Sequence, residues 1–229
     1  MAIKKRPISP RQKMINLMYV VLMAMLALNV STEVLNGFSI VEESLNRTTA
    51  SSSKENQTMY NDFAAQMRSN PAKVKAWFDK ARYVKEMSDS LYDFAQQLKL
   101  DIVKEADGAD GDINNIKNKE SLEAANQVML APIGGKGKKL YNAINSFRER
   151  ILTMITDNNQ KMIISNNLST KLPKKAHAMG KNWQEYMFED MPVAAAVTLL
   201  SKLQSDVRYA EGEVLHTLVS NIDIKDIRV

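Results

Sequence analysis

The sequence predicts an all-α protein in which a single transmembrane helix is followed by an elongated antiparallel helical bundle. No charged residue occurs between Lys13 and Glu33, and most residues of that stretch are apolar. Later segments repeat apolar residues at alternating spacings of three and four, which is the pattern of amphipathic helices. The 229 residues include only eight glycines and six prolines, so few positions interrupt a helix.

Composition excludes several classes of chemistry. The chain has no cysteine, so disulfides, thiolate nucleophiles and thiolate metal ligands are all excluded and packing must hold the fold together. The formal net charge is +5, but five of the 31 Lys and Arg residues lie in residues 1–13. The other 26 basic residues balance the 26 acidic ones. We therefore interpret the excess charge as a topology signal and expect no nucleic-acid partner.

The uncharged stretch begins with the signals of a helix start. Ser9 can cap the helix, Pro10 suits the first helical position, and Gln12 stands where a capping-box partner belongs. A helix over residues 10–30 rises by about 1.5 Å per residue and reaches about 31 Å, the thickness of a bilayer core. This length predicts a transmembrane helix at 10–30.

The charges on either side of this segment predict its orientation. Basic residues precede it and acidic residues, beginning with Glu33, follow it. The positive-inside rule then places the N-terminus in the cytoplasm and exports the rest of the chain. The alternative is a cleaved signal peptide, but Ala24, Ala27 and Ser31 form no clean small-x-small cleavage site. We favour the membrane anchor.

The helix expected after the span has an apolar face. Val34, Phe38, Val41 and Leu45 form a seam like that of a coiled coil. Residues 48–58 are rich in Ser, Thr and Asn, and we expect the helix to weaken there.

A second long helix is predicted after Asn70, which is an N-cap residue followed by Pro71 at the first helical position. Its apolar stripe continues to about Glu105, which corresponds to roughly 50 Å of helix. The Asp- and Gly-rich residues 106–112 break the helix, and a shorter helix is expected over 119–130.

The second half of the chain continues the helical pattern. Apolar residues at alternating spacings of four and three predict a helix over 140–166. Residues 171–190 are a mixed connection with three aromatic residues that we expect to cap one end of the core, Trp183, Tyr186 and Phe188. Pro192 opens a last long helix, which has the most regular apolar seam of the chain.

The chain therefore divides into four parts. We predict a cytoplasmic stub at 1–9, a transmembrane helix at 10–30 and an exported α-helical bundle at 31–221, which is periplasmic if the chain is bacterial. Residues 222–229 lack helical spacing and are predicted to be the extended start of a following domain that is absent here.

No motif indicates catalysis, a metal or a cofactor. The stretch at 106–112 fails the register of a calcium loop, and the Gly- and Lys-rich stretch at 134–139 lacks the spacing of a phosphate-binding loop. His177 and His216 have no ligand partner at i+4 and are expected to be solvated. Several carboxylates are assigned to the polar faces of helices, Glu105, Glu120, Glu123 and Glu211. We expect no enzymatic activity.

The polar residues of the predicted span are informative, because polar groups in hydrocarbon need partners. From their position alone, Arg11 and Lys13 are interpreted as side chains that reach the cytoplasmic headgroups. Asn16 is expected to bond to another helix. The remaining polar contacts are assigned to Gln12, Tyr19 and Asn29. The span has no Asp or Glu, so a proton acceptor would have to come from a partner subunit.

The residues of the span resemble a known family. The sequences PRQKMINLMY at 10–19 and AMLALNV at 24–30 are similar to the N-terminus of the GldM family, called PorM in some species. These are gliding-motility and type IX secretion proteins of Bacteroidota. The similarity continues to Phe38 and recurs between Met191 and Glu211, in the family's last helix of the first periplasmic domain.

This resemblance implies a function that composition alone does not indicate. Members of the family pair as homodimers, with two membrane helices inside a pentameric ring of two-span GldL-like subunits in the inner membrane. The assembly converts the proton-motive force into movement that reaches outer-membrane and periplasmic ring components through C-terminal domains. Those domains are β-rich in full-length members, so this chain would be a truncated form. The resemblance makes Arg11 the counter-ion of a membrane carboxylate on the GldL-like partner.

Two alternatives come from other classes of protein. A membrane-anchored sensor with an extracytoplasmic four-helix ligand domain would need a cytoplasmic signalling domain, and the predicted stub of about nine residues is too short for one. A secreted adaptor released by signal cleavage is the third interpretation.

Overall fold

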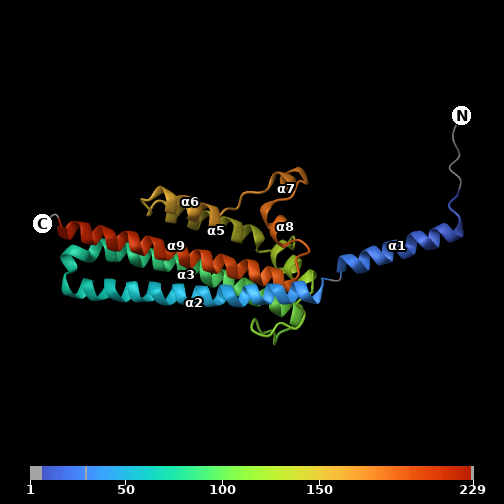
Figure 1. The fold of residues 1–229 in the computed structure, drawn as a ribbon, viewed down its shortest axis with the longest axis horizontal. Helices are drawn as coiled ribbons and strands as arrows, with labels where there is room; N and C mark the ends of the chain where they lie inside the picture. The colour runs from blue at the N-terminus through green and yellow to red at the C-terminus, as the bar shows by residue number, and fades with distance from the viewer. Residues whose placement is uncertain (1–6, 29, 228–229) are drawn as a thin grey trace.

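A computed structural model of the protein describes residues 7–28 and 30–227 (Figure 1). Every regular element in these two ranges is a helix, and none is a strand. The prediction of an all-α fold with an elongated bundle is therefore confirmed. The helix predicted at the N-terminus is present as α1 (Pro10–Leu28).

Three long helices form the main layer of the bundle. They are α2 (Thr32–Ser69), α3 (Pro71–Asp107) and α9 (Val193–Ile227), and they lie side by side along the longest axis (Figure 1). At about 1.5 Å per residue each is about 52–57 Å long. The three long helices alternate in direction along the chain. α3 is antiparallel to both neighbours, whereas α2 and α9 run parallel, because the chain leaves α3 and begins α9 at the same end of the bundle.

The predicted helix boundaries at Asn70 and Pro71 are confirmed, but the predicted weakening of α2 at 48–58 is wrong. α2 is continuous through this stretch. The hydroxyl of Thr58 donates to the carbonyl of Lys54, one turn earlier, and the buried amide of Asn56 donates to the carbonyl of Arg208 on α9 at 3.0 Å. These polar side chains therefore have partners that are compatible with a helix.

The segment after α3 is less helical than predicted. Gly108 ends α3 with a φ of 94°, as the Asp- and Gly-rich stretch indicated. In place of one helix over 119–130, the structure has α4 (Glu123–Ala125) followed by the π-helix η1 (Asn126–Leu130). Residues 119–121 are not helical and bind the start of α9 instead. The carbonyls of Lys119 and Ser121 accept backbone N–H bonds from the first turn of α9, at 3.1 Å each.

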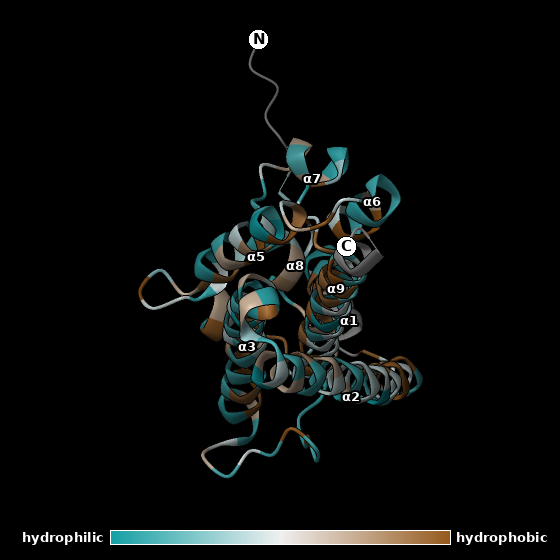
Figure 2. Cartoon of the chain, turned by 90° about the vertical axis from the view of Figure 1, so that its left-hand side faces the viewer, coloured by the Kyte–Doolittle hydropathy of each residue, from teal (hydrophilic) through white to brown (hydrophobic). Residues whose placement is uncertain are grey.

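A second, shorter layer covers α3 and α9 on the side opposite α2 (Figures 1 and 2). It contains α5 (Gly137–Leu152), α6 (Asn158–Asn167), α7 (Lys174–Ala178) and α8 (Trp183–Phe188). The single helix predicted over 140–166 is interrupted, because Asp157 caps a new helix start by accepting the N–H of Gln160 at 2.8 Å.

The core lies between the two layers. Trp183 and Phe188 are buried there as predicted, whereas Tyr186 is exposed. The largest fully buried side chains of the long helices and of α5 include Leu98, Ile102, Leu140, Ile151, Leu200 and Leu215. Packing of these apolar faces holds the layers together in a chain without disulfides.

The C-terminal prediction is wrong for most of its length. Residues 222–227 continue α9 rather than forming an extended segment. Ile222 is buried and follows Leu215 and Leu218 at spacings of seven and four, so it extends the same helix stripe. Residues 228–229 lie outside the described residues.

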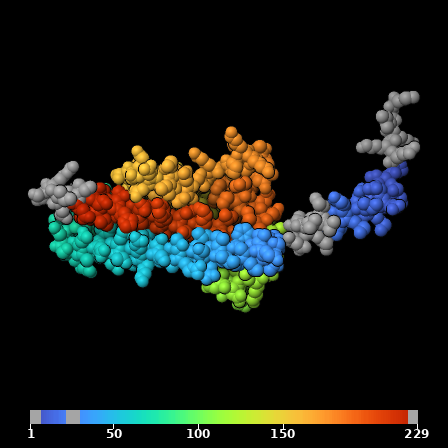
Figure 3. All heavy atoms as spheres, in the orientation of Figure 1, coloured from blue at the N-terminus to red at the C-terminus, as the bar shows by residue number. Residues whose placement is uncertain are grey.

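α1 lies beyond the end of the bundle where α2 begins (Figures 1 and 3). Its described apolar side chains are exposed, including those of Met14, Leu17, Met18 and Val20. In the part of the chain that the structure describes, no helix combines the length and hydropathy that a membrane crossing requires.

Candidate functional site: the N-terminal helix and a buried polar network

The start of α1 has the hydrogen bonds that the sequence predicts. The hydroxyl of Ser9 accepts the N–H of Gln12 at 3.3 Å, and its carbonyl accepts the N–H of Lys13 at 3.0 Å. The side-chain amide of Gln12 donates to Asn16 at 3.1 Å, so these two residues share one face of the helix. Asn16 therefore already has one partner within its own helix.

The other predicted site residues on α1 are exposed. Arg11 and Lys13 lie in its first turns, and Tyr19 follows Gln12 and Asn16 on the same face. Asn29 lies outside the described residues. No other element of the described chain covers these side chains.

A second polar site lies inside the bundle, where the sequence predicted only apolar seams. Two groups of polar side chains join α2, α3 and α9 at different levels. We call them the Glu211 cluster (Tyr60, Lys85, Asp89, Arg208 and Glu211) and the Lys99 cluster (Glu42, Gln96, Lys99, Ser201 and Gln204).

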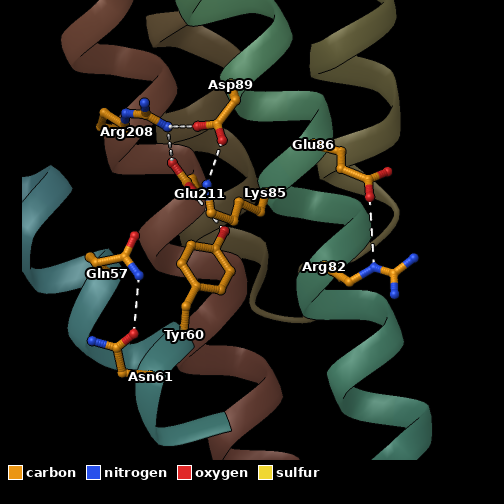
Figure 4. Close-up of polar contacts among 9 residues, drawn as sticks. All are labelled: Gln57, Tyr60, Asn61, Arg82, Lys85, Glu86, Asp89, Arg208 and Glu211. Carbon is orange, nitrogen blue, oxygen red and sulfur yellow. Dashed lines mark hydrogen bonds and ion pairs between the residues drawn. The ribbon is translucent and has the colours of Figure 1, made fainter. Parts of the chain in front are cut away.

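The Glu211 cluster is centred on a fully buried carboxylate (Figure 4). Glu211, on α9, is only 1% exposed. The hydroxyl of Tyr60, from α2, donates to Glu211 Oε1 at 2.7 Å. Arg208 Nη1 donates to Glu211 Oε2 and to Asp89 Oδ1, on α3, at 2.8 Å each. One arginine therefore connects carboxylates from two helices, and a tyrosine brings in the third helix.

The charges of the Glu211 cluster balance. Lys85 Nζ lies 2.6 Å from Asp89 Oδ2, so two cations face two carboxylates. Burial would raise the pKa of Asp89, but hydrogen bonds from Lys85 and Arg208 outweigh burial and hold that pKa below its usual value. Burial and the adjacent Glu211 raise the pKa of Tyr60, so its hydroxyl keeps its proton and remains a donor.

The Lys99 cluster lies nearer the end of the bundle at which α2 begins. Lys99, on α3, is 3% exposed, and its Nζ lies 3.3 Å from Glu42 Oε1 on α2 and 3.2 Å from Gln204 Oε1 on α9. Ser201 donates to Glu42 Oε1 at 2.7 Å, and Gln204 donates to Gln96 at 2.9 Å. Burial lowers the pKa of Lys99, and the attraction of Glu42 opposes that shift.

A close helix contact adjoins the Glu211 cluster. Asn56 is 4% exposed, and its amide donates to the Arg208 carbonyl. A Cβ atom at Gly212 would lie only 2.8 Å from Asn56 Oδ1. The lack of a side chain at position 212 therefore allows α2 to approach α9 closely.

These contacts fix the relative positions of the three helices. Sliding one helix along another would separate buried charges from their partners, and an unpaired buried charge is strongly destabilising. Polar residues inside an apolar helix interface are best attested as determinants of register. Among the described residues, no group of three His, Asp or Glu side chains is placed to hold a metal ion. The arrangement is suited to mechanical stiffness.

The assignment of Glu211 to a polar helix face is wrong, whereas Glu105, Glu120 and Glu123 are exposed as predicted. The spacing of Glu211 relative to apolar residues of α9 already indicated that it is buried. Glu211 lies four residues after Val207 and four before Leu215, so it occupies a position on the buried stripe. His177 and His216 are exposed, as predicted.

A comparison with models of protein families identifies the family of this chain. A search of curated proteins finds none that matches this chain. The family model of the GldM N-terminal domain matches residues 33–221, which extend from the first turn of α2 into the last part of α9. This match covers both polar clusters and both layers of the bundle. The chain therefore belongs to the GldM family, which serves the motor of gliding motility and type IX secretion.

Proposed function

We propose that this chain is a membrane-anchored, periplasmic subunit of a motor driven by the proton-motive force. It transmits mechanical work across the periplasm and so powers type IX protein secretion and gliding motility. The observation that carries this proposal is the family match over residues 33–221, which coincides with the three-helix bundle and its interhelical polar clusters.

In this proposal α1 is the core of a single span over residues 10–30 of the inner membrane, with the N-terminus in the cytoplasm. The basic residues before the span and the acidic residues after it support that orientation. The exposure of Met14, Leu17 and Met18, at 65–69%, supports contact with lipid or with other membrane helices.

The proposed partners are a second copy of this chain and a pentameric ring of two-span GldL-like subunits around the paired helices. Because the span has no Asp or Glu, the proton-binding carboxylate belongs to the ring. Arg11 is the proposed counter-ion of that carboxylate. The other proposed contacts to neighbouring helices are Gln12, Lys13, Asn16, Tyr19 and Asn29.

Proton binding and release at the ring carboxylate would change its attraction for Arg11 and move the ring around the helix pair. The bundle is the proposed lever of this motor. α2 connects it to α1, and the two polar clusters keep α2, α3 and α9 in register under load. Movement then reaches outer-membrane and periplasmic ring components through domains that follow the helical domain in family members.

The test is the Arg11→Ala variant, expressed in cells in the motor complex. We expect secretion and gliding to be lost, because the carboxylate no longer has its cation. Membrane insertion and co-purification with the two-span partner should be retained. Lys5→Ala removes one basic residue of the predicted cytoplasmic stub and leaves residues 10–30 unchanged, so it is the matched control and should keep transport. Normal transport by Arg11→Ala would contradict the assignment of Arg11.

A further inference from the structure

One long stretch of the domain has an uncompensated positive charge. Residues 158–184 contain five lysines and no Asp or Glu, although acidic and basic residues balance over the chain after residue 13. The lysines are Lys161, Lys171, Lys174, Lys175 and Lys181. Lys181 is paired with Glu189, but the other four have no ion pair with any described residue.

Part of this stretch forms one wall of a cleft against α5. The cleft has a volume of about 990 Å³ and is lined by basic side chains from three elements. Lys138 and Arg148 come from α5, Lys171 from the segment after α6, and His177 from α7. Glu149 is the one carboxylate in the lining. Several basic groups from separate elements therefore meet in one cleft with an excess of positive charge.

Several other cations of the domain have a carboxylate partner close by. Lys75, Lys85, Lys136 and Lys202 each lie within 2.8 Å of a carboxylate oxygen. In contrast, Lys138 and Lys171 have no such partner in the described chain. Arg148 uses one N–H to bind the Leu168 carbonyl at 2.8 Å, which orients the guanidinium and leaves other donors available.

The rest of the lining combines neutral polar groups with an apolar wall. Asn145 accepts the Thr170 hydroxyl at 2.7 Å and has its side-chain N–H groups left for a ligand. Tyr141, Trp183 and Leu172 line the same cleft. This combination suits an anion that carries an apolar group rather than a small free ion. Phosphate is the anion that Arg and Lys groups bind most readily through several charge-assisted hydrogen bonds.

The position of the cleft identifies the source of the phosphate. α7 and α8 lie at the end of the bundle nearest α1 (Figures 1 and 3). A basic surface beside a membrane helix attracts anionic lipid headgroups, with a contribution from each Lys or Arg near the surface. Lys174 and Lys175 are exposed on α7 next to the cleft and add to this charge.

We propose that the cleft between α5 and residues 170–184 binds the phosphate headgroup of an anionic phospholipid. The phosphate contacts Arg148 and Lys171, and the glycerol part lies against Leu172 and Trp183. Such binding holds the base of the bundle at the membrane surface. The bundle then moves as one body relative to the membrane components around α1. This proposal rests on the anchoring of α1 in the membrane, but not on proton coupling at Arg11.

Trp183 supplies a direct readout, because it lines the cleft and Trp77 is the only other tryptophan. The full chain with Trp77→Phe, in a non-ionic detergent, is titrated with short-chain phosphatidylglycerol while Trp183 fluorescence is recorded. We expect a saturable change. Replacement of both cations, Arg148→Gln with Lys171→Gln, should weaken binding by at least about tenfold, as expected for the loss of two charges facing a lipid phosphate.

Matched titrations separate the possible ligands. Short-chain phosphatidylcholine has the same acyl chains without net charge and should bind at least about tenfold more weakly. Inorganic phosphate that saturates the cleft as tightly as phosphatidylglycerol would overturn the lipid assignment. Equal binding by the double variant, or no saturation by phosphatidylglycerol, would overturn the site. Lys54→Gln, an exposed change on α2, is the control variant and should bind normally, and circular dichroism checks that all variants are folded.

This test is independent of the motor hypothesis. A chain that binds phosphatidylglycerol but transports normally with Arg11→Ala would support the cleft and contradict the proposed coupling. A chain that fails to bind the lipid but loses transport with Arg11→Ala would contradict the cleft and support the proposed coupling.

Discussion

Arg208 connects more partners than any other side chain of the Glu211 cluster. It donates to carboxylates on α3 and α9, and its guanidinium lies 4.2 Å from the centre of the Tyr92 ring. The side chain is only 13% exposed, so water cannot replace these contacts easily. Its planar group with several donors is suited to this position, whereas lysine would offer a single charged point.

Removal of this cation should destabilise the bundle strongly. Arg208→Met leaves Glu211 and Asp89 close together without the cation between them, and we expect the free energy of unfolding to fall by about 3 kcal/mol. The measurement is urea unfolding followed by circular dichroism. Arg47→Met is the control, because its ion pair with Glu43 is exposed and such pairs contribute about 0–1 kcal/mol. A similar loss of unfolding free energy in both variants would show that the buried cluster stabilises the fold no more than an exposed ion pair does.

The residues of this cluster were only partly predictable. Spacing places Glu211 and Lys99 on buried stripes of their helices, so a charged residue at such a position could have been noticed. The partners within the cluster could not, because Tyr60 lies 151 residues from Glu211 and Asp89 lies 119 residues from Arg208, so both pairs meet only through the register of three helices. Side-chain pairing of this kind is a property of the packed fold.

At the scale of elements, start signals proved more reliable than composition. Asn70 with Pro71 and Pro192 mark helix starts within one residue of those observed. The weakening predicted for the Ser- and Thr-rich middle of α2 was wrong, because local helix propensity is a weak determinant compared with tertiary packing. Residues 119–121 were assigned to a helix, but their carbonyls bind the first turn of α9, which is a long-range contact without a local signal.

The contact between α2 and α9 gives a test at this scale. Ala is favoured over Gly inside a helix by about 1 kcal/mol, so Gly37→Ala, with no atom near the added Cβ, should stabilise α2. Gly212→Ala should instead lower the free energy of unfolding by about 1 kcal/mol, because the Cβ displaces Asn56 and its hydrogen bond.

A double variant isolates the cause. With Asn56→Ala present, the space beside position 212 is larger, and Gly212→Ala should then be neutral or stabilising. The comparison uses chemical unfolding of the four proteins. If Gly212→Ala is equally destabilising in both backgrounds, the close approach to Asn56 is not what requires glycine at that position.

At the scale of the whole molecule, the directions in which the three long helices run are relevant to the proposed lever. α2 and α9 run parallel, and α3 runs back between their ends, so all three helices span the length of the bundle (Figure 1). The parallel pair was not predictable, because it depends on residues 108–192 returning to the end where α3 finishes. A force applied at the start of α2 is thus shared by three helices, which the polar clusters join at two levels.

A break in α2 should therefore uncouple the motor without disassembling it. Ser51 is exposed in the middle of α2, between the two clusters along that helix. Ser51→Pro removes one backbone hydrogen bond and kinks the helix, at a local cost of about 3 kcal/mol. We expect type IX secretion and gliding to fall sharply in cells, while membrane insertion and co-purification with the two-span partner are kept, since the proposed function assigns both to α1. Ser51→Ala, which preserves the helix, should transport normally. Full transport by a folded Ser51→Pro variant would mean that stiffness of α2 is not required, and the bundle would then be a tether and not a lever.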